Sequence, residues 1–573
     1  MTEANLQQDW ETLCKERKQK QLDSIPKEWI IPAVPADVRN VQEIPYTCGL
    51  LSEKEIEITD TTDVELLLQK LSSAEWSSVE VTTAFTKRAI IAHQLTNCLT
   101  EIFIERALER AKACDDYLKA NGKVIGPLHG LPISLKDQFC IKGLETIMGY
   151  AAWIGKPAES DCVLVQILNE LGAVPFIRTN VPQTLYWGET LNNVFGRTVN
   201  PYNRYLTPGG SSGGEGALLA MRGSPLGVGT DIGGSVRIPS GFCGLYTLRP
   251  SYERLPYCGA VNSQEGQESI SSVLGPMTNS LSGVKIFTKA IIDSKPWNKD
   301  PLAVRKEWSD REYALGDHGG TGAKLCFGMM WDNDVIKPHP YLRPAMEITK
   351  AALEAQGHTV IDWENYQHME IFRVAESIFV ADGLYDFRKA CEESGEPFIQ
   401  TCSPIDDPHA WTLEETLTTT LLGEIRPMSA WELWQLHKEK RALRKAQLDH
   451  WQATVKRTGT GRPIDAIISP AAPYTAVPHG LNTDYFYTTY TNAMDYATTV
   501  FPVTFVDSRL DQPDPPHEFH NDHDKAVYHL YDPEVFHGLP VGLQVIGRTL
   551  EEEGVIAMTE IVHSALQTLR KES

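Results

Sequence analysis

The stretch from Pro208 to Gly244 constrains this chain more than any other part of it. Twelve of its residues are glycine. Glycine loses more conformational freedom on folding than any other residue, so a run this dense is expected where the backbone needs positive φ or a close approach to another group. Ser211 and Ser235 each follow a pair of glycines and stand 24 residues apart. We therefore expect tightly turned backbone around both hydroxyls.

A second stretch, HGLPISLKDQF, ends a short apolar run on Lys136. Its apolar residues predict a buried strand with Lys136 at the exit. Burial lowers the pKa of a lysine and can leave it neutral, as a base. A solvated surface lysine is the ordinary alternative, but the two glycine-flanked serines favour the Ser–Lys variant of nucleophilic catalysis. Lys136, Ser211 and Ser235 are therefore the candidate catalytic residues.

Two other glycine motifs fit this stretch less well. Residues 209–213 match G-x-S-x-G, the nucleophile elbow of α/β-hydrolases, but that motif requires a strand just before it. The preceding residues are polar and flanked by prolines. Residues 227–233 read G-x-G-x-x-x-G, which is not the dinucleotide fingerprint, and no G-K-[ST] closes a phosphate loop. Successive free N–H groups in the turn before Ser235 fit a developing oxyanion better.

Charge and composition exclude several classes of partner. The net charge of −22 argues against nucleic acid and anionic membranes. The sequence contains no run of about 18 apolar residues, so we expect no membrane span. The polar N-terminus lacks the apolar core of a signal peptide. The eleven cysteines are scattered without a C-x-x-C pair. Free thiols in a reducing compartment are the simplest interpretation, so we expect a cytoplasmic protein.

The order of predicted elements indicates an α/β fold. Residues 1–60 are polar and broken by prolines, which predicts an arm with short helices. Helices follow over residues 63–120, with capping boxes expected at Ser52, Thr62 and Ser77. From residue 125 onward a helix–glycine–strand–loop rhythm predicts an α/β sheet, with Ser160 capping one of its helices. We expect residues 61–573 to form one domain with its catalytic core at 125–260.

Residues 507–533 form an acidic stretch that carries His517, His520 and His523. Histidines three residues apart among aspartates could bind a metal ion. We interpret the stretch as a mobile polar loop instead, because its sequence predicts no helix to hold the ligands in place. Neither a metal nor a cofactor is therefore expected.

The motifs GGSSGG, the serine after T-D-I-G-G and the lysine in P-I-S-L-K-D resemble the amidase signature family. The spacings from Lys136 to Ser211 (75 residues) and from Ser211 to Ser235 (24 residues) also fit that family. The likeness extends from about Trp10 to the end of the chain and is greatest to fungal acetamidases. Over residues 209–239 the chain is also similar to fatty-acid amide hydrolases. The resemblance implies a single α/β/α domain, with a mixed sheet of about eleven strands covered by helices on both faces.

The resemblance also implies roles for individual residues. Ser235 would be the nucleophile, Ser211 would relay protons after a cis Gly210–Ser211 peptide, and Lys136 would be the base. By the same resemblance, the oxyanion hole would be formed by the N–H groups of Ile232, Gly233, Gly234 and Ser235. The substrate pocket would be lined by Leu185, Tyr186, Trp187, Gly210 and Ser211.

The implied activity is hydrolysis of an amide through an acyl-enzyme, without metal or cofactor. The bulky side chains at residues 185–187 favour small aliphatic amides such as acetamide. The resemblance to the family also favours a homodimer. Larger aryl, indole-acetamide or fatty-acid amides are the alternative substrates. A serine esterase with another relay and a non-catalytic binding protein are the alternative functions, and the intact triad counts against the latter.

Overall fold

The computed structural model describes residues 9–399 and 425–572. Eleven strands form one sheet in the order β1-β3-β2-β4-β6-β5-β10-β11-β9-β7-β8. The strands are β1 (Leu99–Ile102), β2 (Pro132–Lys136), β3 (Val174–Thr179), β4 (Leu226–Asp231), β5 (Tyr246–Arg249), β6 (Val273–Thr278), β7 (Cys326–Met329), β8 (Thr359–Asp362), β9 (Ala466–Pro470), β10 (Thr498–Phe505) and β11 (Pro540–Ile546).

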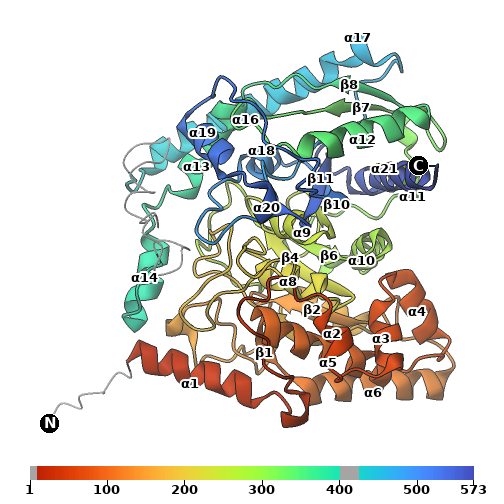
Figure 1. Ribbon diagram of the computed structural model, residues 1–573, viewed down its shortest axis with the longest axis vertical. Coiled ribbons are helices and arrows are strands. Elements are labelled where there is room, and N and C mark those ends of the chain that lie inside the picture. Colours follow the sequence, from red (N-terminus) through yellow and green to blue (C-terminus); the bar gives the residue numbers. More distant parts are fainter. Residues whose placement is uncertain (1–8, 400–424, 573) are drawn as a thin grey trace.

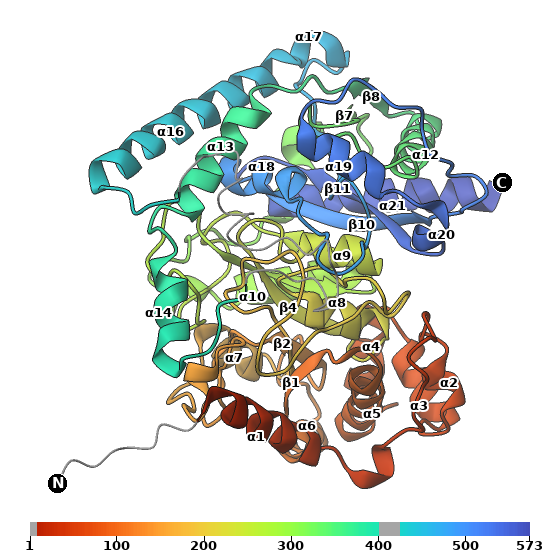
Figure 2. The same cartoon turned by 60° about the vertical axis from the view of Figure 1, so that its left-hand side comes forward.

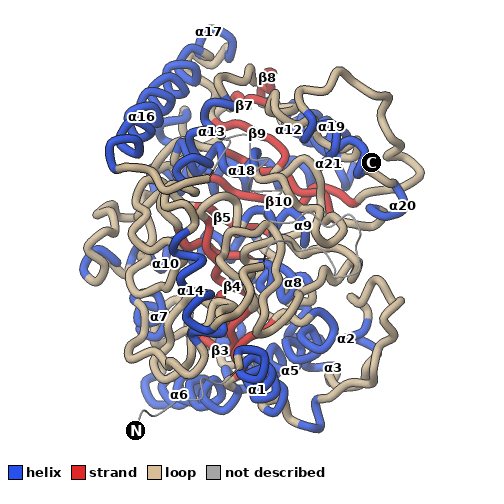
Figure 3. Tube along the Cα trace, turned by 90° about the vertical axis from the view of Figure 1, so that its left-hand side faces the viewer, coloured by secondary structure: helices blue, strands red, loops and turns tan. Residues whose placement is uncertain are grey.

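The sheet is mixed, as the family resemblance implied. Strand β2 runs parallel to both of its neighbours, β3 and β4, whereas β4, β6, β5, β10, β11 and β9 pair antiparallel in turn. The far edge is parallel again, from β9 through β7 to β8. The strands run as a continuous band through the middle of the molecule (Figure 3). In that view α8 (Gly213–Ala220) and α9 (Arg237–Cys243) lie on one side of the band and α10 (Leu281–Asp293) on the other.

The N-terminal helices gather at one end of the sheet and the C-terminal elements at the other (Figures 1 and 2). The remaining α-helices are α1 (Trp10–Asp23), α2 (Ile44–Thr47), α3 (Glu53–Asp60), α4 (Val64–Ser72), α5 (Ser78–Thr96), α6 (Ile104–Asn121), α7 (Val163–Glu170), α11 (Asp310–Tyr313), α12 (Leu342–Ala355), α13 (His368–Phe379), α14 (Tyr385–Ser394), α16 (Ala430–Ala453), α17 (Val455–Thr458), α18 (Phe486–Met494), α19 (Asp522–Leu530), α20 (Pro533–Phe536) and α21 (Glu552–Glu572).

Two glycines on β4 let α8 approach the sheet closely. A Cβ on Gly227 would lie 2.0 Å from Oε2 of Glu215, and a Cβ on Gly229 would lie 2.6 Å from Oγ of Ser212. Both positions point to the same face of the sheet, because side chains alternate along a strand. The start of α8 therefore packs on β4 in space that any larger residue would fill. This close approach explains part of the glycine density between Pro208 and Gly244.

Residues 10–60 pack against the body of the protein. Arg17 on α1 is buried and forms ion pairs with Glu101 and Glu145 (2.7 Å from Nε to Oε2 for the second). Apolar residues of α1 join a small cluster with Ile147, Val194 and neighbouring side chains. Helix α1 thereby contacts loops on both sides of β3.

Some local sequence predictions need correction. The predicted capping boxes at Ser52 and Ser77 are present, but Thr62 caps nothing: Asp63 is the N-cap of α4 and accepts from the N–H of Glu65. Helix α7 begins after Cys162 without a side-chain cap, so the cap predicted at Ser160 is also wrong. Residues 507–533 are not all loop, because Asn521 caps α19 by accepting from the N–H of Asp524. The side-chain cap of Asn521 stabilises the start of this helix, which was not predicted because the segment is rich in acidic residues.

Candidate active site

Lys136 ends β2 in the interior of the protein. Its side chain is 0% exposed, and Nζ lies 2.8 Å from both Ser211 Oγ and Thr230 Oγ1. Thr230 donates its own hydroxyl hydrogen to Gln138 Oε1, so its oxygen remains free to accept from the amine. Burial lowers the pKa of Lys136 to about 7, against an opposing effect of the Asp231 and Glu215 carboxylates. The amine is therefore held at hydrogen-bonding distance from a serine and can exist uncharged near neutral pH.

Ser211 follows a cis peptide bond with Gly210 and lies just before α8. Gly210 is closely surrounded by backbone: a Cβ there would lie 2.5 Å from the carbonyl oxygen of Trp187 and 2.4 Å from that of Glu189. The next N–H, that of Ser212, donates to the carbonyl oxygen of Ser235 over 3.2 Å. This bond fixes the two glycine turns side by side, so the three predicted catalytic residues meet in one place.

Ser235 lies in the turn between β4 and α9 and is 9% exposed. Within the described chain, no hydrogen bond of its hydroxyl is recorded. Asp231, at the end of β4, holds the turn through its carboxylate, which accepts from the N–H groups of Gly234 (2.9 Å) and Val236 (3.2 Å). The Asp231 side chain thus holds the backbone of the turn, whereas no side chain of the described residues is hydrogen-bonded to the hydroxyl of Ser235.

The four N–H groups of residues 232–235, predicted as oxyanion donors, differ in whether they have a hydrogen-bond acceptor within the protein. Gly234 directs its N–H at Asp231, so that group is engaged within the turn. For the N–H groups of Ile232, Gly233 and Ser235, no acceptor is recorded among residues 9–399 and 425–572. Gly234 has φ of +138°, a conformation that strains any other residue. Three of the four predicted oxyanion donors therefore remain available to a ligand.

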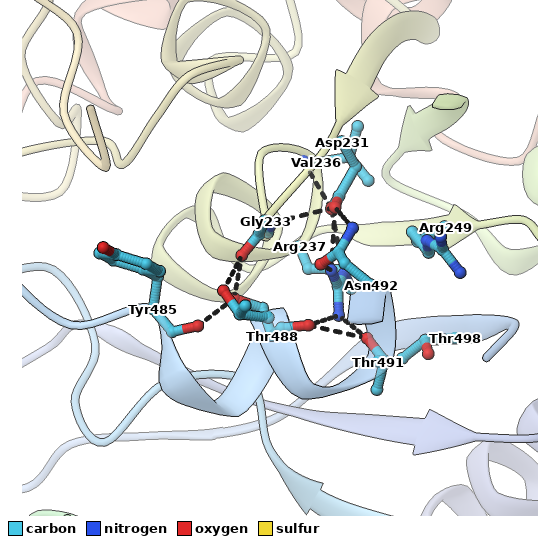
Figure 4. Close-up of polar contacts among 12 residues, drawn as sticks. Asp231, Gly233, Val236, Arg237, Arg249, Tyr485, Thr488, Thr491, Asn492 and Thr498 are labelled. Carbon is cyan, nitrogen blue, oxygen red and sulfur yellow. Dashed lines mark hydrogen bonds and ion pairs between the residues drawn. The ribbon is translucent and has the colours of Figure 1, made fainter. Parts of the chain in front are cut away.

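Arg237 and α18 complete the support of this turn (Figure 4). Arg237 donates twice to the Asp231 carboxylate, over 3.0 and 2.8 Å, and also to the side chain of Asn492 on α18. Asn492 in turn donates to Asp231 over 2.9 Å. Burial raises the pKa of Asp231, but the charge and hydrogen bonds of Arg237 and the amide of Asn492 outweigh it and hold the pKa at about 2. Asp231 is therefore ionised throughout the working range of pH.

Helix α18 also holds the carbonyl of Gly233. Thr488 donates its hydroxyl hydrogen to that oxygen over 2.6 Å (Figure 4). The hydroxyl of Thr489 lies 3.3 Å from the same oxygen. Because the Gly233 carbonyl belongs to the same peptide unit as the Gly234 N–H, both ends of this peptide are fixed. These contacts could not be predicted from local sequence patterns, since the partners are 255 and 256 residues apart.

Two of the predicted pocket residues, Leu185 and Tyr186, belong to different apolar clusters. Leu185 is buried in a cluster with Met148, Tyr150, Val181 and Cys391. Tyr186 packs edge-on against Phe379, with 5.8 Å between the ring centroids, and its hydroxyl donates to Gln264. Phe379 in turn reaches within 4.0 Å of a Cβ position on Gly233. An aromatic wall that includes Phe379, which sequence analysis missed, therefore borders the turn before Ser235.

The histidines of residues 507–533 serve a different purpose. His517 Nε2 lies 3.0 Å from Oδ2 of Asp524. The same oxygen accepts from the N–H of His520, and Oδ1 of Asp524 accepts from the N–H of Lys337. Asp524 is fully buried, so it ties this segment to the loop after β7. Among the described residues, no group of three His, Cys, Asp or Glu side chains is placed to hold a metal ion. Over residues 9–399 and 425–572, no helix has the length and apolar character needed to cross a bilayer.

Comparison with known proteins agrees with this geometry. A family model described as Amidase matches residues 80–556. An acetamidase of Aspergillus oryzae is 42% identical, with 97% of this chain and 99% of that protein aligned. An acetamidase of Emericella nidulans is 40% identical, with 98% of both chains aligned. Among solved structures, a fatty acid amide hydrolase superposes with a TM-score of 0.88 at 31% identity, covering 98% of this chain and 95% of that chain.

Proposed function

Because this chain belongs to the amidase family and is a hydrolase of amide C–N bonds, we propose that it converts small aliphatic amides, such as acetamide, to the carboxylate and ammonia. The observation that carries this proposal is the buried amine of Lys136, hydrogen-bonded to Ser211 beside the turn of Ser235. A base, a relay hydroxyl and a nucleophile are the groups that amide hydrolysis needs when no histidine is used.

The proposed reaction begins with a neutral Lys136. Its amine takes the proton of Ser211, which takes the proton of Ser235 as the Ser235 oxygen attacks the amide carbon. The N–H groups of Ile232, Gly233 and Ser235 stabilise the negative oxygen of the tetrahedral intermediate. The relay then runs in reverse, and the proton passes to the leaving nitrogen as the C–N bond breaks. Water attacks the acyl-enzyme by the same path, releasing the carboxylate and restoring Ser235.

The preference for small substrates rests on the relatives and on the wall beside the site. Two relatives aligned over nearly the whole chain are acetamidases. Phe379 lies 4.0 Å from a Cβ position on Gly233, and Tyr186 packs against Phe379. Fatty-acid amides are the second candidate, favoured by the 31% identity to a fatty acid amide hydrolase of closely similar structure.

A panel of amides tests the proposal. Ammonia release from acetamide, propionamide, benzamide, indole-3-acetamide and oleamide should give the highest kcat/KM with the shortest acyl groups. A maximum at oleamide would contradict the preference for small substrates. Release of alcohol from a matched ester without release of ammonia from any amide would point to an esterase instead.

We also propose that the protein works in the cytosol as a homodimer. The ten cysteines of the described chain are free thiols, which is usual in a reducing compartment. Sedimentation at micromolar concentration should give twice the chain mass of 63.9 kDa. A single species at the chain mass would contradict the dimer.

A further inference from the structure

Glu215, in the first turn of α8, is a fully buried carboxylate that the proposed reaction does not use. Its Oε2 accepts from Ser134 Oγ over 2.6 Å, and its Oε1 accepts from Thr179 Oγ1 over 2.9 Å. Within the described chain, no ion pair of Glu215 is recorded. A buried carboxylate held only by hydroxyls is costly to ionise, so it normally has a cationic partner or takes up a proton.

Both hydroxyls that bind Glu215 belong to the immediate surroundings of Lys136. Ser134 is two residues before Lys136 on β2 and therefore points to the same face of the sheet. Thr179 on β3 is the register partner of Lys136. Gly227 on β4, opposite Ser134, leaves the space that the carboxylate occupies. Three adjacent strands thus fix Glu215 on the same face of the sheet as the Lys136 side chain.

The charges around this pair differ in how they are compensated. Asp231 also acts on Lys136, but Arg237 and Asn492 bind its carboxylate directly. Cys98 lies near Glu215 and remains a neutral thiol, because burial raises its pKa to about 12. Asp137, the residue after Lys136, faces Arg178 at 3.5 Å. Glu215 is therefore the carboxylate near Lys136 whose charge no cation of the described chain contacts.

We propose that Glu215 is a positioning residue of the proton relay: its carboxylate, held by Ser134 and Thr179 beside Lys136, sets how readily the lysine amine takes up a proton. Burial raises the pKa of Glu215 to about 7, opposed by the two hydroxyls and by the charge of Lys136. The two groups thus titrate as a pair over the same range of pH. An ionised Glu215 favours protonated Lys136, and a neutral Glu215 favours the free amine that accepts the Ser211 proton.

The substitution Glu215→Gln tests this inference, which depends on the proposed role of Lys136 as base. Glutamine keeps the shape but removes the negative charge: its carbonyl oxygen can accept from one of the two hydroxyls, and its NH2 group can donate to the other. The acid limb of the kcat/KM–pH profile for acetamide should move to lower pH by about one unit or more. Ser134→Ala removes one donor to the carboxylate and so favours its protonated form. It should move the limb in the same direction by less, and it serves if Glu215→Gln does not fold.

Two controls separate the possible outcomes. Glu552→Gln neutralises another fully buried carboxylate, paired with Arg254 elsewhere in the molecule, and should leave the limb in place. Lys136→Ala should abolish the limb. If the limb persists in Lys136→Ala, the role of the lysine as base is wrong. If Lys136→Ala abolishes it but Glu215→Gln and Ser134→Ala leave it at the wild-type pH, only the inference about Glu215 is overturned.

Discussion

Two buried carboxylates of the glycine-rich stretch, Glu215 and Asp231, act on Lys136, and their surroundings differ. Asp231 accepts hydrogen bonds from two backbone N–H groups, from Arg237 and from Asn492. Glu215 accepts from two hydroxyls, with no ion pair recorded in the described chain. The side formed by β4, α9 and α18 keeps a fixed charge and a fixed backbone. The side formed by β2, β3 and α8 contains groups whose protonation can change near neutral pH.

This contrast assigns a different task to each side of the site. A hole for an oxyanion must be rigid, because preorganised dipoles stabilise charge without the cost of reorganising during the reaction. A proton relay needs groups with pKa values near the working pH. The pKa of Asp231 is held at about 2, whereas the pKa values of Lys136 and Glu215 are shifted to about 7. Variants on the two sides should therefore fail in different ways.

Ser235 stands where the two sides meet, and its loss should have the largest effect. Ser235→Ala should lower kcat on acetamide by about 10⁵-fold or more, because no acyl-enzyme can form. Folding should be preserved, since no hydrogen bond of this hydroxyl is recorded in the described chain. A fluorophosphonate probe should label wild-type Ser235, as located by mass spectrometry. Ser240→Ala, which removes a buried hydroxyl nearby on α9, is the matched control and should remain active. Labelling of a different serine alone would refute the assignment.

Lys136→Ala should affect the titrating side. The loss of a general base lowers kcat/KM by about 10²–10⁴-fold. The neutral amine is the active form, so wild-type kcat/KM should rise tenfold per pH unit below the pKa of about 7 and level off above it. The variant should lack that acid limb. Profiles of both proteins on acetamide decide the matter: an unchanged limb in the variant would mean that Lys136 stays protonated and only orients Ser211.

Arg237→Met should damage the rigid side and shift the other side in the opposite sense to Glu215→Gln. Removing one partner of a buried ion pair destabilises a protein by about 3–5 kcal/mol. Asp231, no longer balanced by Arg237, then favours protonated Lys136, so the acid limb should move to higher pH. Thermal unfolding and the pH profile measure the two effects. Arg237→Lys keeps the positive charge, so its acid limb should stay close to the wild-type pH, although its thermal stability should still be lower than that of the wild type. A limb that moves to lower pH in Arg237→Met would contradict the electrostatic distinction between the two sides.

The sequence predicted the titrating side better than the rigid side, for a physical reason. Lys136 at the end of an apolar run and the two glycine-flanked serines are local patterns, and the structure brings these residues together. Glu215 reads locally as an ordinary acidic residue in the first turn of a helix, so its contacts with Ser134 and Thr179 could not be foreseen. Strand β6 was not predicted, because it lies in a segment rich in glycine and serine. The contacts of α18 with Gly233 and Arg237 join residues about 250 positions apart, for which one sequence offers no signal.

Thr488→Val should have the smallest effect and tests whether α18 serves the oxyanion turn. Valine has nearly the shape of threonine but cannot donate to the Gly233 carbonyl, which Thr488 contacts at 2.6 Å. A single hydrogen bond contributes about 0.5–1.5 kcal/mol, which corresponds to a loss of about 2–13-fold.

The loss from Thr488→Val should fall on kcat rather than KM, because a less rigid turn weakens the stabilisation of the oxyanion more than the binding of a neutral amide. The acid limb should stay in place, since the change leaves every charged group intact. Thr489→Val is the matched control: its hydroxyl lies 3.3 Å from the same oxygen, so the loss should be smaller. A rise in KM at constant kcat would instead assign Thr488 to substrate binding, and a moved limb would show that the two sides of the site are not independent.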